Sequence, residues 1–230
     1  MGGNSDYIVE VHDLIKDYQL GNTVVHALRG IFLKIQRKDF TAVVGPSGSG
    51  KSTLLDLIGC LGQPSLGYIT INGEDISKYD DDKLSDFRAQ NIGFIFQTFN
   101  LIEVFSAFEN VEYPLLLLKL PKKEREMRVT EILEKVGLRE FMKHRPNELS
   151  GGQRQRVAIA RSLVKRPTFV LADEPTANLD SETGKSILDL MVELNKSLST
   201  TFICATHDRM VMDRADKVFL LKDGKIVEDK

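Results

Sequence analysis

The strongest constraint on the fold of this chain is a short glycine-rich run. Residues 45–52 read Gly-Pro-Ser-Gly-Ser-Gly-Lys-Ser and fit the pattern G-x-x-x-x-G-K-[ST]. The apolar segment 40–44 before the run predicts a buried strand, and 52–61 after it predicts a helix. This order of strand, turn and helix is the context in which the pattern binds phosphate groups. The sequence therefore predicts a phosphate-binding P-loop at 45–52.

The residue types in this loop explain how it would hold an anion. Glycine permits positive φ, which turns several backbone N–H groups inward, and the N-terminus of the following helix attracts negative charge. Lys51 would place its charge on the β- and γ-phosphates of a nucleotide, and the Ser52 hydroxyl would ligate magnesium. The predicted nucleotide contacts of this region are Gly45, Pro46, Ser47, Gly48, Ser49, Gly50, Lys51, Ser52 and Thr53.

The composition is that expected of a soluble globular protein. The 230 residues suffice for one large domain or two small lobes, and 42% of them are hydrophobic. The formal net charge of −2 gives no general attraction to nucleic acid, so no nucleic-acid partner is expected. Cys60 and Cys204 lie far apart without a second pair of ligands, so buried thiols are expected rather than a disulfide framework or a zinc site.

The sequence also predicts how the chain could relate to a membrane. Residues 1–6 lack the basic and apolar regions of a signal peptide, and the cytosol is therefore the expected compartment. The most apolar stretch, 114–120, is far shorter than the about 20 residues that cross a bilayer. Any membrane role is expected to come through a partner.

The apolar pattern predicts an α/β fold made of interleaved lobes. Short β-rich segments predict an antiparallel lobe at 7–11, 24–28, 31–35 and 68–71, with tight turns at Gly21-Asn22 and Asn72-Gly73. A further turn at Asp223-Gly224 is predicted to close the last two strands of the chain. Further strands are predicted at 92–96, 169–173, 201–205 and 218–221, and helices at 81–90, 122–136, 153–163 and 182–196. The predicted fold class is a P-loop NTPase core with a mostly parallel sheet and the antiparallel β lobe (1–96 and 166–230), into which a helical lobe (97–165) is inserted.

A second motif supports a family resemblance. Residues 149–153 read Leu-Ser-Gly-Gly-Gln, and the chain here resembles the nucleotide-binding domain of ABC transporters, whose signature is LSGGQ. The motif begins a predicted helix, and hydroxyl, backbone N–H groups and helix dipole together suit an anion. The resemblance implies that Ser150, Gly151, Gly152 and Gln153 contact the γ-phosphate of ATP held in the P-loop of another subunit.

Two carboxylates follow the predicted strand at 169–173. Asp173 and Glu174 resemble the Walker B motif and the catalytic glutamate of the family. Ligands of parallel sheets bind at the C-terminal ends of strands, where these side chains are expected. The resemblance implies that Asp173 holds magnesium and that Glu174 polarises the attacking water.

Four further positions match the family pattern. Gln97 resembles the Q-loop glutamine that contacts magnesium and the attacking water, and His207 resembles the switch histidine that reaches the γ-phosphate. Asn178-Leu179-Asp180 resembles the D-loop, which implies that Asp180 lies at a subunit interface beside the nucleotide. Tyr18 is placed like the aromatic residue that stacks on adenine in the family. The implied cofactors are ATP and magnesium, and the implied activity is ATP hydrolysis.

The resemblance covers residues 7–229 and is nearest to the MacB and LolD group. It implies an ATP-dependent homodimer at the cytoplasmic face of the membrane, paired with an FtsX-like permease. The implied task is lipoprotein release, or drug or peptide efflux. Apolar residues between Gln97 and Pro114 predict the surface for that permease, and they are Phe99, Leu101, Ile102, Val104, Phe105 and Phe108.

Other functions stay open at this point. An FtsE-like regulator would signal through a membrane partner without transport, and the sequence does not distinguish it from an exporter. A soluble ABC ATPase acting on DNA or ribosomes would usually carry inserted domains or a second cassette, which this chain lacks. A small-molecule P-loop kinase is disfavoured because LSGGQ is followed by a D-loop.

Overall fold

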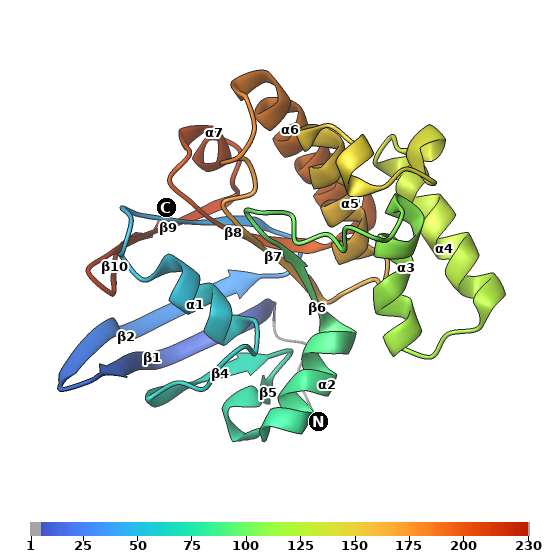
Figure 1. Cartoon of the computed structure of the whole chain (residues 1–230). Coiled ribbons are helices and arrows are strands. Elements are labelled where there is room, and N and C mark those ends of the chain that lie inside the picture. Colours follow the sequence, from blue (N-terminus) through green and yellow to red (C-terminus); the bar gives the residue numbers. More distant parts are fainter. Residues whose placement is uncertain (1–5, 230) are drawn as a thin grey trace. The chain divides into compact units, whose positions relative to one another are not determined.

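The computed structural model describes residues 6–229 (Figure 1). Contacts divide the described residues into two compact units, one formed by 6–88 with 201–229 and the other by 89–200. The predicted helical lobe, 97–165, lies within the second of these units. Helix α2 (Asp81–Asn91) carries the chain from the first unit into the second.

A long β-hairpin dominates the N-terminal part of the first unit. Strands β1 (Tyr7–Leu20) and β2 (Thr23–Gln36) pair antiparallel over 14 residues each, and the predicted turn at Gly21-Asn22 joins them. The prediction of three short segments was therefore wrong about strand length. Asp13 and Gly30, which interrupt the apolar pattern, adopt φ of 46° and 81° beside shifts in the pairing register. Residues whose types suggest turns in the sequence are therefore accommodated as β-bulges within the long strands.

The rest of this antiparallel sheet follows the prediction. Its strand order is β2-β1-β4-β5, with β4 (Leu66–Ile71) and the short β5 (Glu74–Asp75) joined by the Asn72-Gly73 turn. Both turn residues have positive φ, which Asn and Gly adopt at low cost. A short 3₁₀ helix, Ile76–Lys78, follows β5.

A second group of strands in the first unit carries the P-loop. Strand β3 (Phe40–Val44) runs parallel to β8 (Thr201–Thr206) and to β9 (Lys217–Lys222), and β10 (Lys225–Asp229) pairs antiparallel with β9. All residues of β3 and β8 are buried. Helix α1 (Lys51–Ile58) follows β3, and the short α7 (Arg209–Met212) follows β8. Strands buried on both faces are typical of parallel sheets, which confirms the predicted α/β class.

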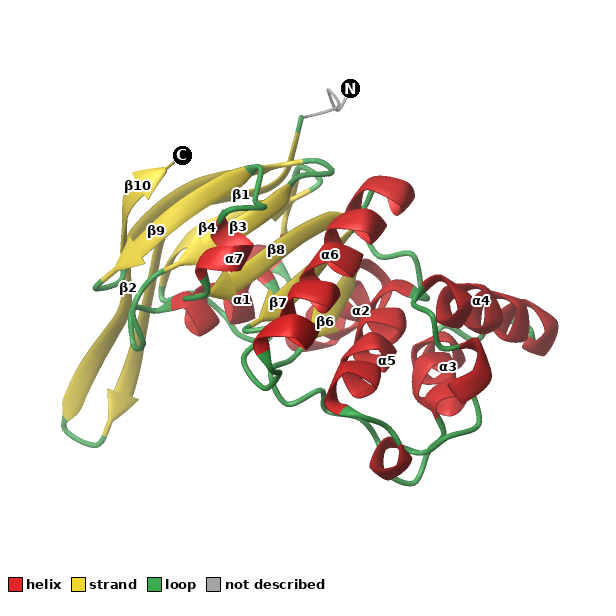
Figure 2. Cartoon of the chain, turned by 90° about the horizontal axis from the view of Figure 1, so that it is seen from above, coloured by secondary structure: helices red, strands yellow, loops and turns green. Residues whose placement is uncertain are grey.

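The second unit combines two parallel strands with a group of helices. Strands β6 (Ile92–Ile95) and β7 (Phe169–Asp173) pair in parallel. The helices are α3 (Ala107–Leu117), α4 (Lys122–Lys135), α5 (Gly151–Leu163) and α6 (Ser181–Leu198), with 3₁₀ turns at Arg139–Phe141 and Pro146–Glu148. Figure 2 shows α3, α4 and α5 side by side, and these three helices contact one another. A Cβ at Gly93 would lie 2.5 Å from the Ser162 carbonyl oxygen, so β6 lies directly against α5.

Two expectations from composition are also tested by the structure. Both cysteines are buried free thiols, as predicted, and burial raises the pKa of the Cys60 thiol to about 12. Within 6–229, none of the helices combines the length and the hydropathy that crossing a bilayer requires.

Candidate functional site

The P-loop has the backbone conformation that its glycines predict. Strand β3 ends at Val44, and α1 begins at Lys51 with Gly50 as its N-cap. Gly48 and Gly50 have φ of 77° and 105°, a region that residues with a Cβ rarely enter. The first turn of α1 contains no acidic side chain. Because its N–H groups are not covered by a carboxylate of that turn, the end of the helix suits an anion.

The loop is pressed closely against other backbone of the first unit. A Cβ at Gly45 would lie 2.1 Å from the Leu221 carbonyl oxygen, and one at Gly50 would lie 2.6 Å from that of Ala27. The Gly224 N–H in the β9–β10 turn donates to the Ser49 carbonyl at 3.1 Å. Larger residues at 45 and 50 would therefore displace β9 or β2. The shape of the P-loop depends on glycine at both positions.

Lys51 is held by the loop that it follows. Its Nζ donates to the carbonyl oxygens of Gly45 and Pro46 at 2.9 and 3.1 Å, and the residue is only 8% exposed. The buried Ser49 Oγ has no hydrogen-bond partner among the described residues. A buried ammonium, an unpaired hydroxyl and a helix N-terminus are together a set of donors. The residues present therefore fit a phosphate chain.

The first unit also holds the predicted tyrosine and histidine. Tyr18 lies on β1 and is 40% exposed, with the Lys16 Nζ 5.0 Å from its ring centroid. His207 is exposed directly after the buried end of β8. The next residue, Asp208, caps α7 by accepting from the Met210 N–H at 2.8 Å. Because strand end and cap are both fixed, the backbone on either side of His207 is fixed too.

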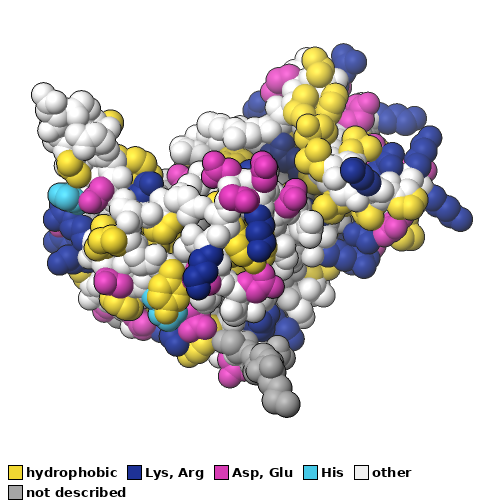
Figure 3. Space-filling model, turned by 90° about the horizontal axis from the view of Figure 1, so that it is seen from below, with side chains coloured by type: hydrophobic (Ala, Val, Ile, Leu, Met, Phe, Trp, Pro, Cys, Tyr) yellow, Lys and Arg dark blue, Asp and Glu magenta, His cyan; other side chains and the backbone are white. Residues whose placement is uncertain are grey.

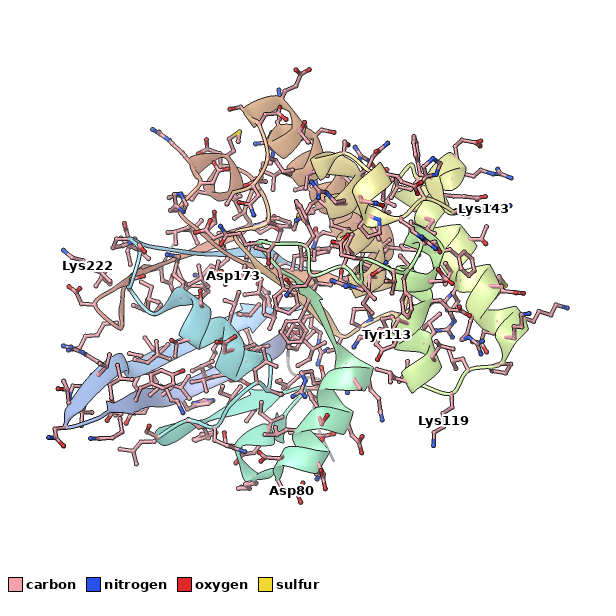
Figure 4. The ribbon with its side chains drawn as sticks, viewed as in Figure 1. Asp80, Tyr113, Lys119, Lys143, Asp173 and Lys222 are labelled. Atoms are coloured by element: carbon pink, nitrogen blue, oxygen red, sulfur yellow. The ribbon has the colours of Figure 1, made fainter. Side chains whose placement is uncertain are left out.

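The predicted carboxylates lie at the end of β7 in the second unit. Asp173 is the last residue of that strand, and Figure 4 labels it. Glu174 follows with φ of 46°, a conformation that costs free energy for a residue with a side chain. The turn beyond is fixed by the fully buried Gln155, whose Nε2 donates to the Pro175 carbonyl at 2.7 Å.

Gln97 lies in the same unit, two residues after the end of strand β6. Strand β6 ends at Ile95 rather than at Phe96, so Gln97 is exposed in a turn. Its carbonyl accepts from the Asn178 Nδ2 at 2.8 Å, which joins the Q-loop to the D-loop. The carbonyls of Phe99 and Asn100, both with positive φ, accept from the Arg161 guanidinium of α5. Hydrogen bonds from α5, the helix that begins with the signature, therefore fix the segment after Gln97.

The signature residues form the start of α5, two positions earlier than predicted. The Ser150 Oγ accepts from the Gln153 N–H at 3.3 Å, and the Ser150 N–H donates to Gln153 Oε1 at 2.8 Å. This reciprocal capping box satisfies backbone groups at both positions. With Ser150 as its N-cap, the helix begins at Gly151, before the first apolar residue of the periodic pattern.

The signature glycines pack against the start of α6. A Cβ at Gly151 would lie 3.3 Å from Leu179, and one at Gly152 would lie 2.7 Å from Thr183. Asp180 caps α6 by accepting from the Thr183 N–H at 3.0 Å, and the hydrogen bonds from Thr183 lower the pKa of the Asp180 carboxyl. The second unit thus brings the signature and the D-loop together.

The oxygen donors present suit magnesium bound with phosphate rather than a cage made of protein alone. Within 6–229 there is no group of three or more His, Cys, Asp or Glu residues that could hold a metal ion. Magnesium bound with a polyphosphate needs only one or two protein oxygens. Ser52 of the first unit carries a hydroxyl oxygen, and Gln97 and Asp173 of the second unit carry an amide oxygen and a carboxylate.

Sequence reasoning missed several residues that support the site. Gln155 and Arg161 fix the segments after β7 and β6, and Lys16 lies beside Tyr18. One signal was available for Gln155, because it lies three and four positions before the apolar Ala158 and Ile159 and so falls on the buried face of its helix.

Comparison with known proteins identifies the family. The family model described as "ABC transporter" matches residues 28–177. The chain is 45% identical over 222 residues to the lipoprotein-releasing system ATP-binding protein LolD of Legionella pneumophila, covering 96% of this chain and 98% of that protein. It is 46% identical over 222 residues to the macrolide export ATP-binding/permease protein MacB of Hyphomonas neptunium, of which it covers 34%.

A solved structure agrees with these sequence relatives. The dimeric post-hydrolysis state of the ATP-binding cassette MJ0796, bound to ADP and Pi, matches with a TM-score of 0.88 and 42% identity, covering 96% of this chain and 97% of that one. The protein of that name from Methanocaldococcus jannaschii is 42% identical over 227 residues. The chain therefore belongs to the ABC transporter family, and it is an ATP-hydrolysing subunit of that family.

Proposed function

We propose that this ATPase powers an FtsX-like permease in lipoprotein release or in drug or peptide efflux, as a peripheral subunit at the cytoplasmic face of the membrane. The LolD and MacB relatives support this subgroup, because one is named for lipoprotein release and the other for macrolide export. MacB is also named as ATP-binding protein and permease in one chain. The matching third of MacB corresponds to the chain described here.

The observation that carries the head-to-tail dimer in this proposal is the presence of two helix N-termini suited to phosphate. One is α1 behind the P-loop, and the other is α5 behind the signature. A single nucleotide in the P-loop accounts for α1. The second N-terminus is accounted for if α5 serves the nucleotide of another subunit, in a head-to-tail homodimer.

The residues of the first unit bind the nucleotide in this proposal. The P-loop amides and Lys51 hold the phosphates, Tyr18 stacks on adenine, and His207 reaches the γ-phosphate. Ser52 contributes an oxygen ligand for magnesium, as Gln97 and Asp173 do in the second unit. When bound, magnesium neutralises charge that develops on the phosphate oxygens.

The residues of the second unit act on the water and on the partner subunit. Glu174 orients and polarises the attacking water, and Gln97 contacts the same water. Ser150 to Gln153 and Asp180 contact the nucleotide of the partner. Phosphoryl transfer depends on positioning and charge stabilisation, so fixed backbone at Glu174 and at the start of α5 favours it.

A composite site predicts that two defective chains can restore each other. Ser150→Arg places a bulky side chain where the partner's phosphate would bind, so we expect this variant alone to lose ATP turnover. ATP binding by the monomer should persist. Mixing this variant with Lys51→Ala gives mixed dimers that contain one intact site, with Lys51 from one chain and Ser150 from the other. Phosphate release from the mixture should exceed the sum of the separate variants.

The control for this experiment is a mixture in which no intact site can form. A chain carrying both substitutions, mixed with either single variant, should give no recovery. If the two single variants together release no more phosphate than they do apart, the composite site is wrong.

The surface for the permease is proposed at the segment between Gln97 and Pro114. Val104 is 72% exposed, whereas Phe105 is half-buried and contacts Tyr113 with a centroid distance of 6.2 Å. The buried Asn110 fixes this segment, since its amide bonds the N–H of Ile102 and the carbonyls of 102, 105 and 106. Figure 3 shows hydrophobic side chains gathered with Lys and Arg on its right-hand side, which α3 and α4 occupy in Figure 1. A rigid, exposed apolar segment favours a protein partner.

Val104→Asp tests this surface. We expect the chain to detach from membranes that contain its permease, because a carboxylate would have to be buried without a partner. Purified ATPase activity should stay at the parental level, since Val104 is exposed and lies outside the nucleotide residues. Sedimentation of membranes followed by immunoblotting measures the attachment. Val227→Asp, at an exposed position of β10 in the first unit, is the matched control and should stay attached. If Val104→Asp also stays attached, the surface lies elsewhere.

A further inference from the structure

Lys16 and Tyr18 lie on the same face of β1, because side chains two residues apart in a strand point the same way. The Lys16 ammonium is 5.0 Å from the centroid of the Tyr18 ring, within the range of a cation–π contact. The ring is 40% exposed, and the Lys16 ammonium lies over it. Lys16 is therefore the charged group that can restrict the orientation of this ring.

We propose that Lys16 is a positioning residue, which holds the Tyr18 ring ready to receive the nucleotide base. The inference rests on the proposed role of Tyr18 in stacking on adenine. A ring that is already fixed loses less freedom when a base stacks on it, so affinity for the base rises without any contact between Lys16 and the nucleotide.

The ammonium is itself anchored to the segment that follows α1. Lys16 Nζ donates to the Gln63 carbonyl at 2.7 Å. The Asp17 N–H donates to Ser65 Oγ at 3.0 Å, and the Ser65 N–H donates to the Ile15 carbonyl at 2.8 Å. The two bonds with Ser65 fix the β1 backbone on both sides of Lys16, and the bond to Gln63 fixes its head group. A lysine with a fixed backbone and a bonded head group can hold a neighbouring ring in place.

A bulge connects this arrangement to the P-loop. Lys16 pairs with Leu28 and Asp17 pairs with His26, so Ala27 of β2 is the extra residue. The Ala27 carbonyl oxygen would lie 2.6 Å from a Cβ on Gly50, the N-cap of α1. Bulges commonly re-aim side chains beside functional sites. The bulge opposite Lys16 and Asp17 thus also contacts the phosphate loop.

The expected effect of Lys16→Met is specific to the base. Methionine keeps most of the side-chain length but removes the charge. We expect the Kd for ATP to rise about two- to fivefold, the size of an exposed cation–π contact. The Kd for tripolyphosphate, which has no base, should not change. The kcat should stay parental, so that the change appears in KM, and Lys16→Arg should restore the parental Kd because it retains the cation.

Calorimetric titration of the full chain with ATP and with tripolyphosphate tests the inference. The matched control is Lys34→Met, because the Lys34 ammonium lies over the Tyr7 ring on the same hairpin at 5.1 Å; this variant should bind ATP like the parent. Adding Lys16→Met to Tyr18→Ala should have no further effect. Equal losses for ATP and tripolyphosphate would overturn the inference, and so would an ATP affinity that Lys16→Met leaves unchanged.

The Tyr18→Ala variant separates this inference from the assignment on which it rests. If Tyr18→Ala binds ATP like the parent, Tyr18 does not stack on the base and the proposed role of that residue is wrong. If Tyr18→Ala weakens ATP binding but Lys16→Met does not, the stacking role stands and only the role of Lys16 is rejected.

Discussion

Replacing Glu174 with Gln is expected to lower ATP turnover by about 10²- to 10⁴-fold while ATP binding persists. The amide keeps the shape of the side chain, but it has no negative charge with which to orient and polarise water. Glu174 has a left-handed backbone conformation, which fixes the direction of its Cα–Cβ bond. We expect the glutamine side chain to leave the backbone in the same direction. Phosphate release at saturating ATP measures turnover, and titration with ATP measures binding.

The same substitution should also change the oligomeric state. If ATP joins two subunits and hydrolysis separates them, blocked hydrolysis should leave the dimer closed. Size-exclusion chromatography with ATP and magnesium should show the parent mainly as a monomer and the variant at twice the mass. Glu193→Gln, at an exposed position of α6, is the matched control and should behave like the parent. Near-parental turnover of Glu174→Gln would remove Glu174 from its proposed role.

The elements that the sequence predicted well are those with local causes. Strands β3 and β7 have the predicted bounds, because each is a continuous apolar segment that ends at a turn or at charged residues. The β1–β2 hairpin was predicted as shorter pieces, because Asp13 and Gly30 interrupt its pattern. Their left-handed conformations are accepted only because the two long strands pair on both sides of them. Here the pairing of the two strands outweighs the local preference of Asp13 and Gly30 for turns.

The candidate site shows the same division between local and distant causes. The P-loop and the signature are each a turn followed by a helix, so a short motif contains most of the information. The contacts that fix them come from elsewhere in the chain: Asn178 binds the Gln97 carbonyl, and the Ala27 carbonyl closes on Gly50. No pattern in a single sequence predicts which distant backbone group will meet a given glycine.

Lys51→Ala is expected to weaken ATP binding by about 10- to 150-fold, the effect of losing hydrogen bonds that involve a charged group. The structure adds a reason specific to this chain. The Lys51 ammonium also bonds the carbonyls of Gly45 and Pro46, so its positive charge offsets the negative ends of those two dipoles. Without it, two carbonyl dipoles and a polyphosphate would repel each other with no cation between them. Calorimetric titration with ATP measures the loss.

The nucleotide dependence of that loss identifies its cause. Because Lys51 is assigned to the β- and γ-phosphates, AMP affinity should fall much less than ATP affinity. Lys143→Ala, an exposed lysine of the second unit (Figure 4), is the matched control and should bind both nucleotides like the parent. A thermal midpoint near that of the parent would show that the P-loop strand and helix remain folded. If a folded Lys51→Ala variant bound ATP like the parent, or lost AMP and ATP affinity equally, the charge of Lys51 would not be acting on the terminal phosphates and the P-loop assignment would fail.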